Sequence, residues 1–387
     1  MKWKKLVAWG AALLWIAGMA PVCAVPVGAA PSAPSVSAEA AVLMEAESGR
    51  VLWEKQPDRR LSMASTTKIM TALLALESER LEEPVTVTAK MLRTEGSSIY
   101  LKAGDCLTLR SLVAGLMLES GNDAALVIAI TLDGSEAAFA RRMNRRAAQL
   151  GMTNTHFVTA SGLDDDAHYT TARDLAVLGC AAMHNPDFVQ IVSKQSITVD
   201  FVDHSARRTF YNHNRLLREM SGCIGIKTGF TKKSGRCLVS CCERDGIRLV
   251  AVTLRAPDDW NDHKQLMNWG FAQVERVVLN NGPLNVTVPV VGAGEIASAA
   301  LAEPDAAQAV IPVGRAGDIR MKLELEPFLY APVAPDRVVG KITYWLDGEQ
   351  IAERPLHAQT SIPAQPLRPT VWQKIGDFFA RLFGRRT

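Results

Sequence analysis

The chain has 387 residues, of which 48% are hydrophobic and 21% charged, and its formal net charge is +3. These values are ordinary for a globular protein with a sizeable core, and the length predicts two or three domains. The first 24 residues carry three lysines and no acid, so the remaining chain is close to neutral. We therefore expect no general surface for nucleic acid or other polyanions.

The N-terminus has the pattern of a secretory signal peptide, predicted over residues 1–24. A basic start precedes an apolar segment from Leu6 to Met19, and small residues follow it. The apolar segment is short for a membrane span, which favours cleavage over a retained anchor. Residues 25–37 are rich in Pro, Ala and Ser and predict a flexible leader.

An exported protein can form disulfides, but buried thiols are equally compatible with the cysteine pattern. Neither a C-x-x-C pair nor a His cluster accompanies the cysteines, so we expect no metal site and no cofactor. Six cysteines follow the signal segment: Cys106, Cys180, Cys223, Cys237, Cys241 and Cys242.

The pattern over residues 38–278 predicts an α/β (α+β) fold in which helices lie between N- and C-terminal strands. A hairpin is expected at 41–54, and a second one at 235–254 around the Asp245-Gly246 turn. Helical segments are expected at 66–76, starting near Ser65, at 107–133 with an interruption at 120–122, and at 135–150, 171–183 and 262–276.

After about residue 279 the helical periodicity fades and short β-type segments follow. Asp347-Gly348 has the composition of a hairpin turn between two of them. We predict a small all-β domain over 279–362 and a Pro-rich linker over 363–369.

Residues 370–387 predict an amphipathic helix that lies in a membrane surface. From Arg368 to the end there are five basic residues and one acidic residue. An aromatic-rich apolar face opposite a cationic face suits an interfacial helix rather than a span. A helix docked on the protein itself, or a dimerisation helix, remains an alternative. The apolar face consists of Val371, Trp372, Ile375, Phe378, Phe379, Leu382 and Phe383.

Three short motifs carry the chemistry, and they occur in a fixed order. They are Ser65-Thr66-Thr67-Lys68, Ser120-Gly121-Asn122 and Lys227-Thr228-Gly229. Ser and Lys three residues apart at a helix start share one face, where a neutral Lys amine can activate the hydroxyl. Each motif alone has an ordinary structural explanation: a helix cap, a helix–helix turn and a strand start. Lys68, however, directly adjoins the apolar run IMTALLAL, where an unpartnered cation would be costly.

The motif triplet is typical of penicillin-binding proteins and class A β-lactamases, with Ser-Asp-Asn as the usual middle motif. Nearly the whole chain resembles the serine D-alanyl-D-alanine carboxypeptidases, the low-molecular-mass penicillin-binding proteins. The similarity includes RLSMASTTKIMTALLALE, SGNDAA, SGLDDDAHYTTARDLA and IGIKTGFT. It implies a β-lactamase/transpeptidase-like domain with helices packed on an antiparallel sheet, followed by the small β domain and a membrane-anchoring helix. The stretch APDDWNDH is similar to a sporulation-associated subgroup.

The resemblance also implies a role for each motif residue. Ser65 would attack the bond between two D-alanines of a peptidoglycan stem peptide, Lys68 would accept its proton, and Ser120 would relay a proton to the departing D-alanine. The substrate would be held by Asn122, Lys227, Thr228, Gly229 and Phe230, with the backbone N–H groups of Ser65 and Phe230 as the oxyanion hole. β-Lactams would acylate Ser65. The protein would act at the outer face of the cytoplasmic membrane.

Two positions depart from the family pattern. Some relatives carry an Arg after the second strand that follows K-T-G, where this chain reads PDDWND, with Arg255 just before it. Ala160-Ser161-Gly162 stands where many relatives have a His before Gly-Leu. Two other functions compete with the carboxypeptidase. A β-lactamase would need a deacylating base, for which Asp164, Asp165 and Asp166 are available, and a penicillin-sensing or wall-binding module would need no turnover.

Overall fold

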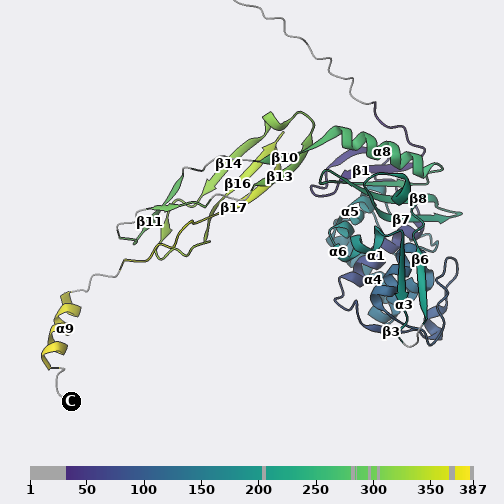
Figure 1. Cartoon of the computed structure of the whole chain (residues 1–387), viewed down its shortest axis with the longest axis horizontal. Helices are drawn as coiled ribbons and strands as arrows, with labels where there is room; N and C mark the ends of the chain where they lie inside the picture. Colours follow the sequence, from purple (N-terminus) through teal and green to yellow (C-terminus); the bar gives the residue numbers. More distant parts are fainter. Residues whose placement is uncertain are drawn as a thin grey trace, which may run out of the picture. The chain divides into compact units, whose positions relative to one another are not determined.

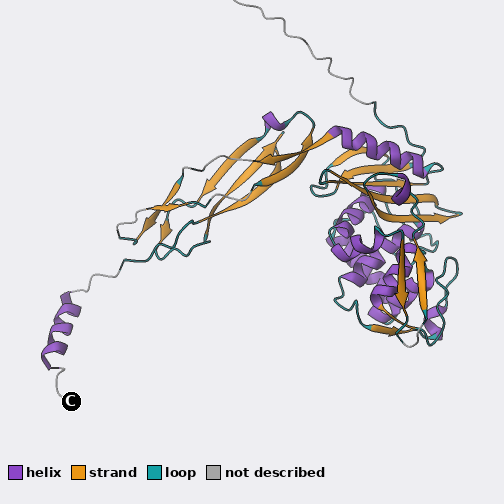
Figure 2. Ribbon diagram, viewed as in Figure 1, coloured by secondary structure: helices purple, strands orange, loops and turns teal. Residues whose placement is uncertain are grey.

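The computed structural model describes residues 32–202, 206–279, 284, 286–294, 298–302, 306–365 and 371–383. The predicted signal peptide and most of the predicted leader lie outside these residues. The described chain forms a mixed helix-and-sheet domain, a β domain and a C-terminal helix (Figure 1, Figure 2).

The first domain is built on a five-stranded antiparallel sheet in the order β2-β1-β9-β8-β7. Its strands are β1 (Ala40–Glu45), β2 (Val51–Lys55), β7 (Cys223–Thr231), β8 (Gly235–Arg244) and β9 (Ile247–Leu254). The hairpins predicted at 41–54 and 235–254 are confirmed. The second one turns at Asp245 and Gly246, both with positive φ, as a tight hairpin turn requires.

Both faces of this sheet are buried. Along β1, Val42 and Met44 face the main core, whereas Leu43 faces a second core, because successive side chains of a strand point to opposite faces. The main core is covered by the helices of the middle sequence, and the second core by α8 (Asp259–Gln273) (Figure 1). The predicted order along the chain, strands followed by helices and then strands, is therefore confirmed. In space these elements form three layers, with the sheet between the middle helices and α8.

The helices that cover the main core match the predicted segments to within a few residues. They include the short 3₁₀ helix η1 (Ala64–Thr67), α1 (Lys68–Leu76), α2 (Leu109–Leu118), α3 (Asn122–Asp133), α4 (Glu136–Gln149) and α5 (Ala172–Met183). Two further helices were not predicted: α6 (Pro186–Val192), which also packs on the main core, and α7 (Leu216–Glu219), whose Leu216 packs in the second core. Smaller elements that the sequence did not predict are β3 (Pro84–Thr86), η2 (Ala89–Leu92), β4 (Cys106–Thr108), β5 (Ser196–Asp200) and β6 (Arg207–Tyr211).

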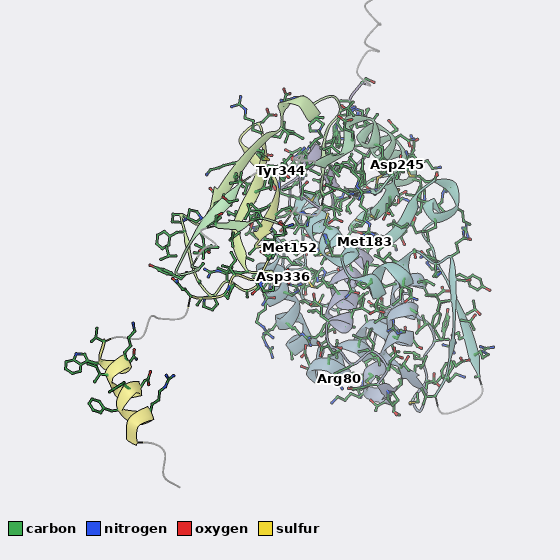
Figure 3. All side chains as sticks on the ribbon, turned by 60° about the vertical axis from the view of Figure 1, so that its left-hand side comes forward. Arg80, Met152, Met183, Asp245, Asp336 and Tyr344 are labelled. Atoms are coloured by element: carbon green, nitrogen blue, oxygen red, sulfur yellow. The ribbon has the colours of Figure 1, made fainter. Side chains whose placement is uncertain are left out.

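The β domain has its own hydrophobic core, in which Ile342 and Tyr344 (Figure 3) are buried. The predicted hairpin at Asp347-Gly348 is confirmed, since it joins the paired strands β16 and β17. The strands are β10 (Val274–Leu279), β11 (Thr287–Val291), β12 (Ser298–Ala300), β13 (Ala307–Pro312), β14 (Arg320–Leu325), β15 (Leu329–Tyr330), β16 (Val338–Leu346) and β17 (Glu349–His357), with a short 3₁₀ helix, η3 (Ala316–Asp318).

The packed structure extends past two of the predicted boundaries. Val36 is buried against the second core, and the Ser37 hydroxyl donates to Asp262 Oδ2 on α8 (2.8 Å), so packing begins ahead of residue 38. Strand β10 starts at Val274, directly after α8, and pairs with β13, ahead of the predicted boundary at 279. Both segments bind partners that lie about thirty or more residues away in the sequence, which local composition does not indicate.

The six cysteines are free thiols, and all but the half-buried Cys223 are buried. Helix α9 (Val371–Phe383) occupies the predicted amphipathic segment, and its Trp372 and Phe378 are 81% and 59% exposed. Across the described ranges, no single helix is long and apolar enough to cross a membrane; the bent pair of α5 and α6 satisfies the length and composition only when the two are taken together.

A buried histidine makes the stability of the first domain depend on pH. His263 on α8 lies between Ser240 Oγ (2.5 Å from Nδ1) and Thr253 Oγ1 (3.0 Å from Nε2), and burial lowers its pKa to about 3. Between pH 6.5 and 3 the unfolded chain binds a proton at this site and the folded chain does not. The free energy of unfolding therefore falls as the pH falls through this window.

We expect a His263→Gln variant to lose less stability on acidification than the wild type, by about 2–3 kcal/mol between pH 7 and pH 4.5. Denaturant unfolding of both proteins at the two pH values measures this difference. Equal losses in the two proteins would mean that His263 is not held neutral by the fold.

Candidate active site

Ser65 lies in a constrained turn at the start of α1. The preceding residue, Ala64, has a φ of +48°, which residues with a side chain rarely adopt. Gly162, from a loop nearly a hundred residues later, packs against this turn so closely that a Cβ there would lie 1.9 Å from Ala64 O. The position of Ser65 is therefore fixed by contacts from two separate segments.

Lys68, one turn further on, is fully buried and contacts three oxygens. Its Nζ lies 2.9 Å from Ser65 Oγ, 2.7 Å from Asn122 Oδ1 and 2.6 Å from Ser161 O. The last two can only accept hydrogen bonds. A neutral amine uses its two N–H groups on them and turns its lone pair toward the Ser65 hydroxyl. This is the geometry of a base beside its nucleophile.

The orientation of Asn122 is fixed independently of Lys68. Its Nδ2 donates to the carbonyl oxygen of Glu95 (2.6 Å), and its backbone N–H donates to Ser97 O (2.7 Å). Since Glu95 O cannot donate, the amide oxygen of Asn122 must be the atom that faces Lys68. The middle motif therefore holds the lysine in place.

The surroundings favour a neutral Lys68. Burial lowers its pKa well below the usual value, and the nearby Lys227 lowers it further, while Asp123 opposes these effects. Lys227 is itself buried, and this burial lowers its pKa to about 7. Two buried lysines near one hydroxyl thus supply both a proton acceptor and a residual positive charge.

Strand β7 carries the third motif along the free edge of the sheet. Its Gly229 allows a close approach to the nucleophile turn, because a Cβ there would lie 3.1 Å from the backbone nitrogens of Ser65 and Thr66. The edge position also leaves alternate backbone groups of β7 unpaired by any neighbouring strand.

The backbone of Phe230 is one of these edge groups. Phe230 pairs with Arg236 on β8, and the Arg236 carbonyl accepts from Ala256 N on the side away from β7. Because the N–H and C=O of one strand residue point the same way, the Phe230 N–H faces the free edge. Gly229, next to Phe230, is the residue of β7 that approaches Ser65 N, and the oxyanion hole formed by Ser65 N and Phe230 N stays a prediction. The Lys227 Nζ donates to Thr228 O (3.0 Å) at this edge.

Ser120 lies in the turn between α2 and α3 with a φ of +62°. The residue is 7% exposed, and among the described contacts its hydroxyl has no hydrogen-bond partner in the protein. The first two motifs thus meet at the Lys68–Asn122 contact. The third motif joins them because Gly229 approaches the turn of Ser65 and because the charge of Lys227 acts on Lys68.

Sequence reasoning missed the residues that support the motifs. His168 Nδ1 accepts from Val158 N (3.0 Å), so its proton lies on Nε2, which donates to Thr67 Oγ1 (2.8 Å). Thr67 in turn donates to Ala64 O (2.8 Å). Burial lowers the pKa of His168 to about 4, and the neutral ring ties its loop to the nucleophile turn. In the sequence, only the family resemblance singles out the segment HYTT that contains His168.

Asp123 is a second supporting residue. Its buried carboxylate accepts from the Ser98 hydroxyl (2.7 Å) and from the backbone N–H groups of Ile99 and Leu101 (both 3.0 Å). It therefore orders the loop that precedes β4 beside the site. Its place in the SGNDAA segment was the available signal.

The acidic loop (Asp164, Asp165 and Asp166) and Arg255 bind residues other than Ser65 and Lys68. Asp164 accepts from Thr231 Oγ1 (2.9 Å), Asp165 accepts from Ala167 N (2.7 Å), and Asp166 pairs with Lys233 (2.5 Å). None of the three has a bond to Ser65 or Lys68 among the described contacts. A different set of partners holds Arg255: it pairs with Glu39 (3.1 Å) and donates to Lys233 O (3.0 Å).

A serine activated by a buried lysine, between a helical layer and the edge of an antiparallel sheet, is the arrangement of serine acyl-transfer enzymes of the penicillin-binding class. The profile of the family described as D-alanyl-D-alanine carboxypeptidase matches residues 28–258, and that of the penicillin-binding protein 5 C-terminal domain matches residues 285–364.

Individual relatives agree with these matches. The chain is 34% identical to the D-alanyl-D-alanine carboxypeptidase DacC of Escherichia coli, covering 91% of both chains, and 27% identical to DacF of Bacillus subtilis, covering 88% of this chain and 90% of the relative. The solved structure of penicillin-binding protein 5 from Haemophilus influenzae superposes with a TM-score of 0.67 at 29% identity, over 86% of this chain and 99% of that one.

The chain therefore belongs to the D-alanyl-D-alanine carboxypeptidase family of serine hydrolases. The predicted fold class and family are confirmed. The assignment to a sporulation subgroup stays a prediction. Its APDDWNDH segment has a structural role here, because Asp259 binds Arg236 (3.0 Å) and Asp262 holds the residues before β1.

We expect Asp123→Asn to destabilise the first domain by about 1–3 kcal/mol, because the amide nitrogen would face a buried backbone N–H. Asp258→Asn, at the exposed N-cap of α8 where the side chain makes no cap hydrogen bond, is the matched control. Thermal and denaturant unfolding measure both variants. A similar loss in the two would contradict the role given to Asp123.

Proposed function

We propose that the protein is a serine D-alanyl-D-alanine carboxypeptidase that removes the terminal D-alanine from peptidoglycan stem peptides. This trimming would limit cross-linking during cell-wall synthesis. The observation that carries the proposal is the buried Lys68 amine, whose Nζ lies 2.9 Å from Ser65 Oγ and is held by Asn122 Oδ1 and Ser161 O.

The acylation step follows from this geometry. Ser65 Oγ bonds to the carbonyl carbon between the two D-alanines while its proton moves to Lys68 Nζ. The backbone N–H groups of Ser65 and Phe230 stabilise the oxyanion of the tetrahedral intermediate. The C–N bond then breaks, and Ser120 relays a proton to the departing amine of D-alanine. The unpartnered hydroxyl of Ser120 is available for this transfer.

Deacylation repeats the sequence with water as the nucleophile. Lys68 takes a proton from the water, the ester bond to Ser65 breaks, and the serine hydroxyl is restored. β-Lactams present a strained amide to the same nucleophile, so they are expected to acylate Ser65 and to act as covalent inhibitors.

Lys227 and Thr228 are proposed to bind the terminal carboxylate of the substrate. The buried charge of Lys227 and the free edge of β7 support this role, because an extended peptide can add to an unpaired strand edge. Since Arg255 is paired with Glu39, these residues carry the carboxylate without a further Arg. Asn122 would orient the substrate amide, and Gly229 would leave room for its backbone.

We also propose that the protein is exported and attached to the outer face of the cytoplasmic membrane through α9. The signal-peptide pattern of residues 1–24 supports export. The exposed aromatic side chains of α9, including Trp372 and Phe379, support an interfacial position. We propose the domain limits 38–278 and 279–362 with the linker at 363–369, adjusted at the first two boundaries by the packing of Val36 and the pairing of β10 with β13.

We expect the protein to release D-alanine from a stem pentapeptide and Ser65→Ala to lose at least about 10³-fold of this activity. Lys68→Arg should lose about 10²–10⁴-fold, because a guanidinium stays protonated and cannot act as a base. Lys264→Arg, an exposed lysine paired with Glu219 (2.7 Å), is the matched control. Free D-alanine and labelling by a fluorescent penicillin are measured together. Full release by the Ser65 variant would exclude the proposal.

Removing residues 366–387 should transfer the protein from the membrane fraction to the soluble fraction without changing D-alanine release from a soluble peptide. The reason is that α9 supplies the proposed membrane contact and carries none of the motif residues. Fractionation followed by the activity assay checks both statements. A truncated protein that stays with membranes would contradict the role of α9.

A further inference from the structure

Three exposed apolar side chains form a patch at one end of the β domain. Phe328 and Tyr330 are 43% and 66% exposed, and their rings meet edge to face with centroids 5.3 Å apart. Val291, 52% exposed, is the direct partner of Tyr330 in the parallel pair of β11 and β15. We call these three residues the distal patch.

The distal patch lies at the end of the β domain opposite to its connection with the first domain. That connection is Val274, which pairs with Pro312, and the nearby Arg315 binds Asp347 in the β16–β17 turn (2.8 Å). The patch belongs to the other end, where β16 begins and where Asp336 lies (Figure 3). In Figure 1, β11 and β10 likewise mark opposite ends of this domain.

The chain leaves the β domain beside the patch. Val333 and Ile362 exchange two backbone hydrogen bonds (both 2.9 Å), and Gln365 N donates to Gly292 O (2.7 Å), one residue after Val291. Helix α9 begins at Val371, six residues after Gln365. Six residues span at most about 20 Å, so the start of α9 can never be far from the patch.

We propose that the distal patch rests on the same lipid surface as α9 and forms a second membrane contact. This inference rests on the proposed membrane role of α9. The short connection favours lipid over a protein partner, because a membrane that holds α9 is always within reach of the patch. Phe and Tyr side chains are favourable in the headgroup region of a membrane, and their binding there does not require charged lipid.

The charges near the patch agree with an apolar contact. Glu326, two residues before Phe328, pairs with Arg337 (3.2 Å), and the exposed Asp336 adds one acidic charge, so these groups have no net positive charge to attract anionic lipid. Binding by the patch should therefore be insensitive to salt, whereas binding by the cationic face of α9 weakens as salt rises. This difference separates the two contacts experimentally.

The test uses the chain without residues 1–24 and vesicles of phosphatidylglycerol and phosphatidylethanolamine in equal parts. We expect Phe328→Ser/Tyr330→Ser to bind about tenfold more weakly than the wild type, since a second contact on a tethered chain acts at high effective concentration. The ratio should be the same at low and high salt. Val278→Ser/Val313→Ser, a pair of exposed valines on β10 and next to β13, is the matched control and should bind as the wild type does. Equal melting temperatures verify that the variants fold.

Each other outcome contradicts a specific part of the inference. Equal binding of the patch variant and the wild type contradicts the proposed membrane contact of the distal patch and leaves the proposed role of α9 unaffected. Unchanged binding after removal of residues 366–387 overturns the role of α9. A wild type that binds no vesicles overturns both. A wild-type dimer that the patch substitutions convert to monomer in sedimentation assigns the patch to a second copy of the chain instead of lipid. D-alanine release, measured in parallel, shows whether the enzymatic proposal stands regardless of these results.

Discussion

The Lys68 amine is the group on which the arrangement of this site depends. A buried amine without partners would cost several kcal/mol, and here three oxygens from three segments surround it. Those oxygens belong to the turn before α1, to the start of α3 and to the loop before α5. Folding can satisfy the lysine only by bringing these segments together, and this same step places Ser65, Asn122 and Ser161 around one space.

The sheet borders the site on the side opposite the helices, and it contributes more through the position of its edge strand than through hydrogen bonds. Strand β7 lies at an edge, so its outer backbone groups have no strand partner, and Gly229 lets this edge approach the nitrogen of Ser65. A buried Lys227 adds a charge that lowers the pKa of Lys68. The helices thus provide the nucleophile and base, while the sheet provides the surface along which an extended substrate can lie.

Patterns of local origin were predictable from the sequence. The Asp245-Gly246 and Asp347-Gly348 turns, the helix after Ser65 and the buried state of Lys68 each follow from a few neighbouring residues. The contacts of His168, Ser161 and Asp123 were not predictable in this way, because each joins residues that only the tertiary fold brings together. A histidine in a loop has no periodicity to mark it, and a backbone carbonyl such as that of Ser161 has no sequence signature at all. The same reason explains the packed residues before β1, whose partner on α8 lies more than two hundred residues later.

The fit between Gly162 and Ala64 has a consequence for how this enzyme can vary. Because no side chain fits at 162 while Ala64 keeps its positive φ, the two positions must change together or not at all. Substitutions in the loop of Gly162 and His168 are therefore constrained by the turn that carries Ser65, and the reverse also holds, although the two segments are far apart in the sequence. A chimera assembled from two relatives should take both segments from the same parent.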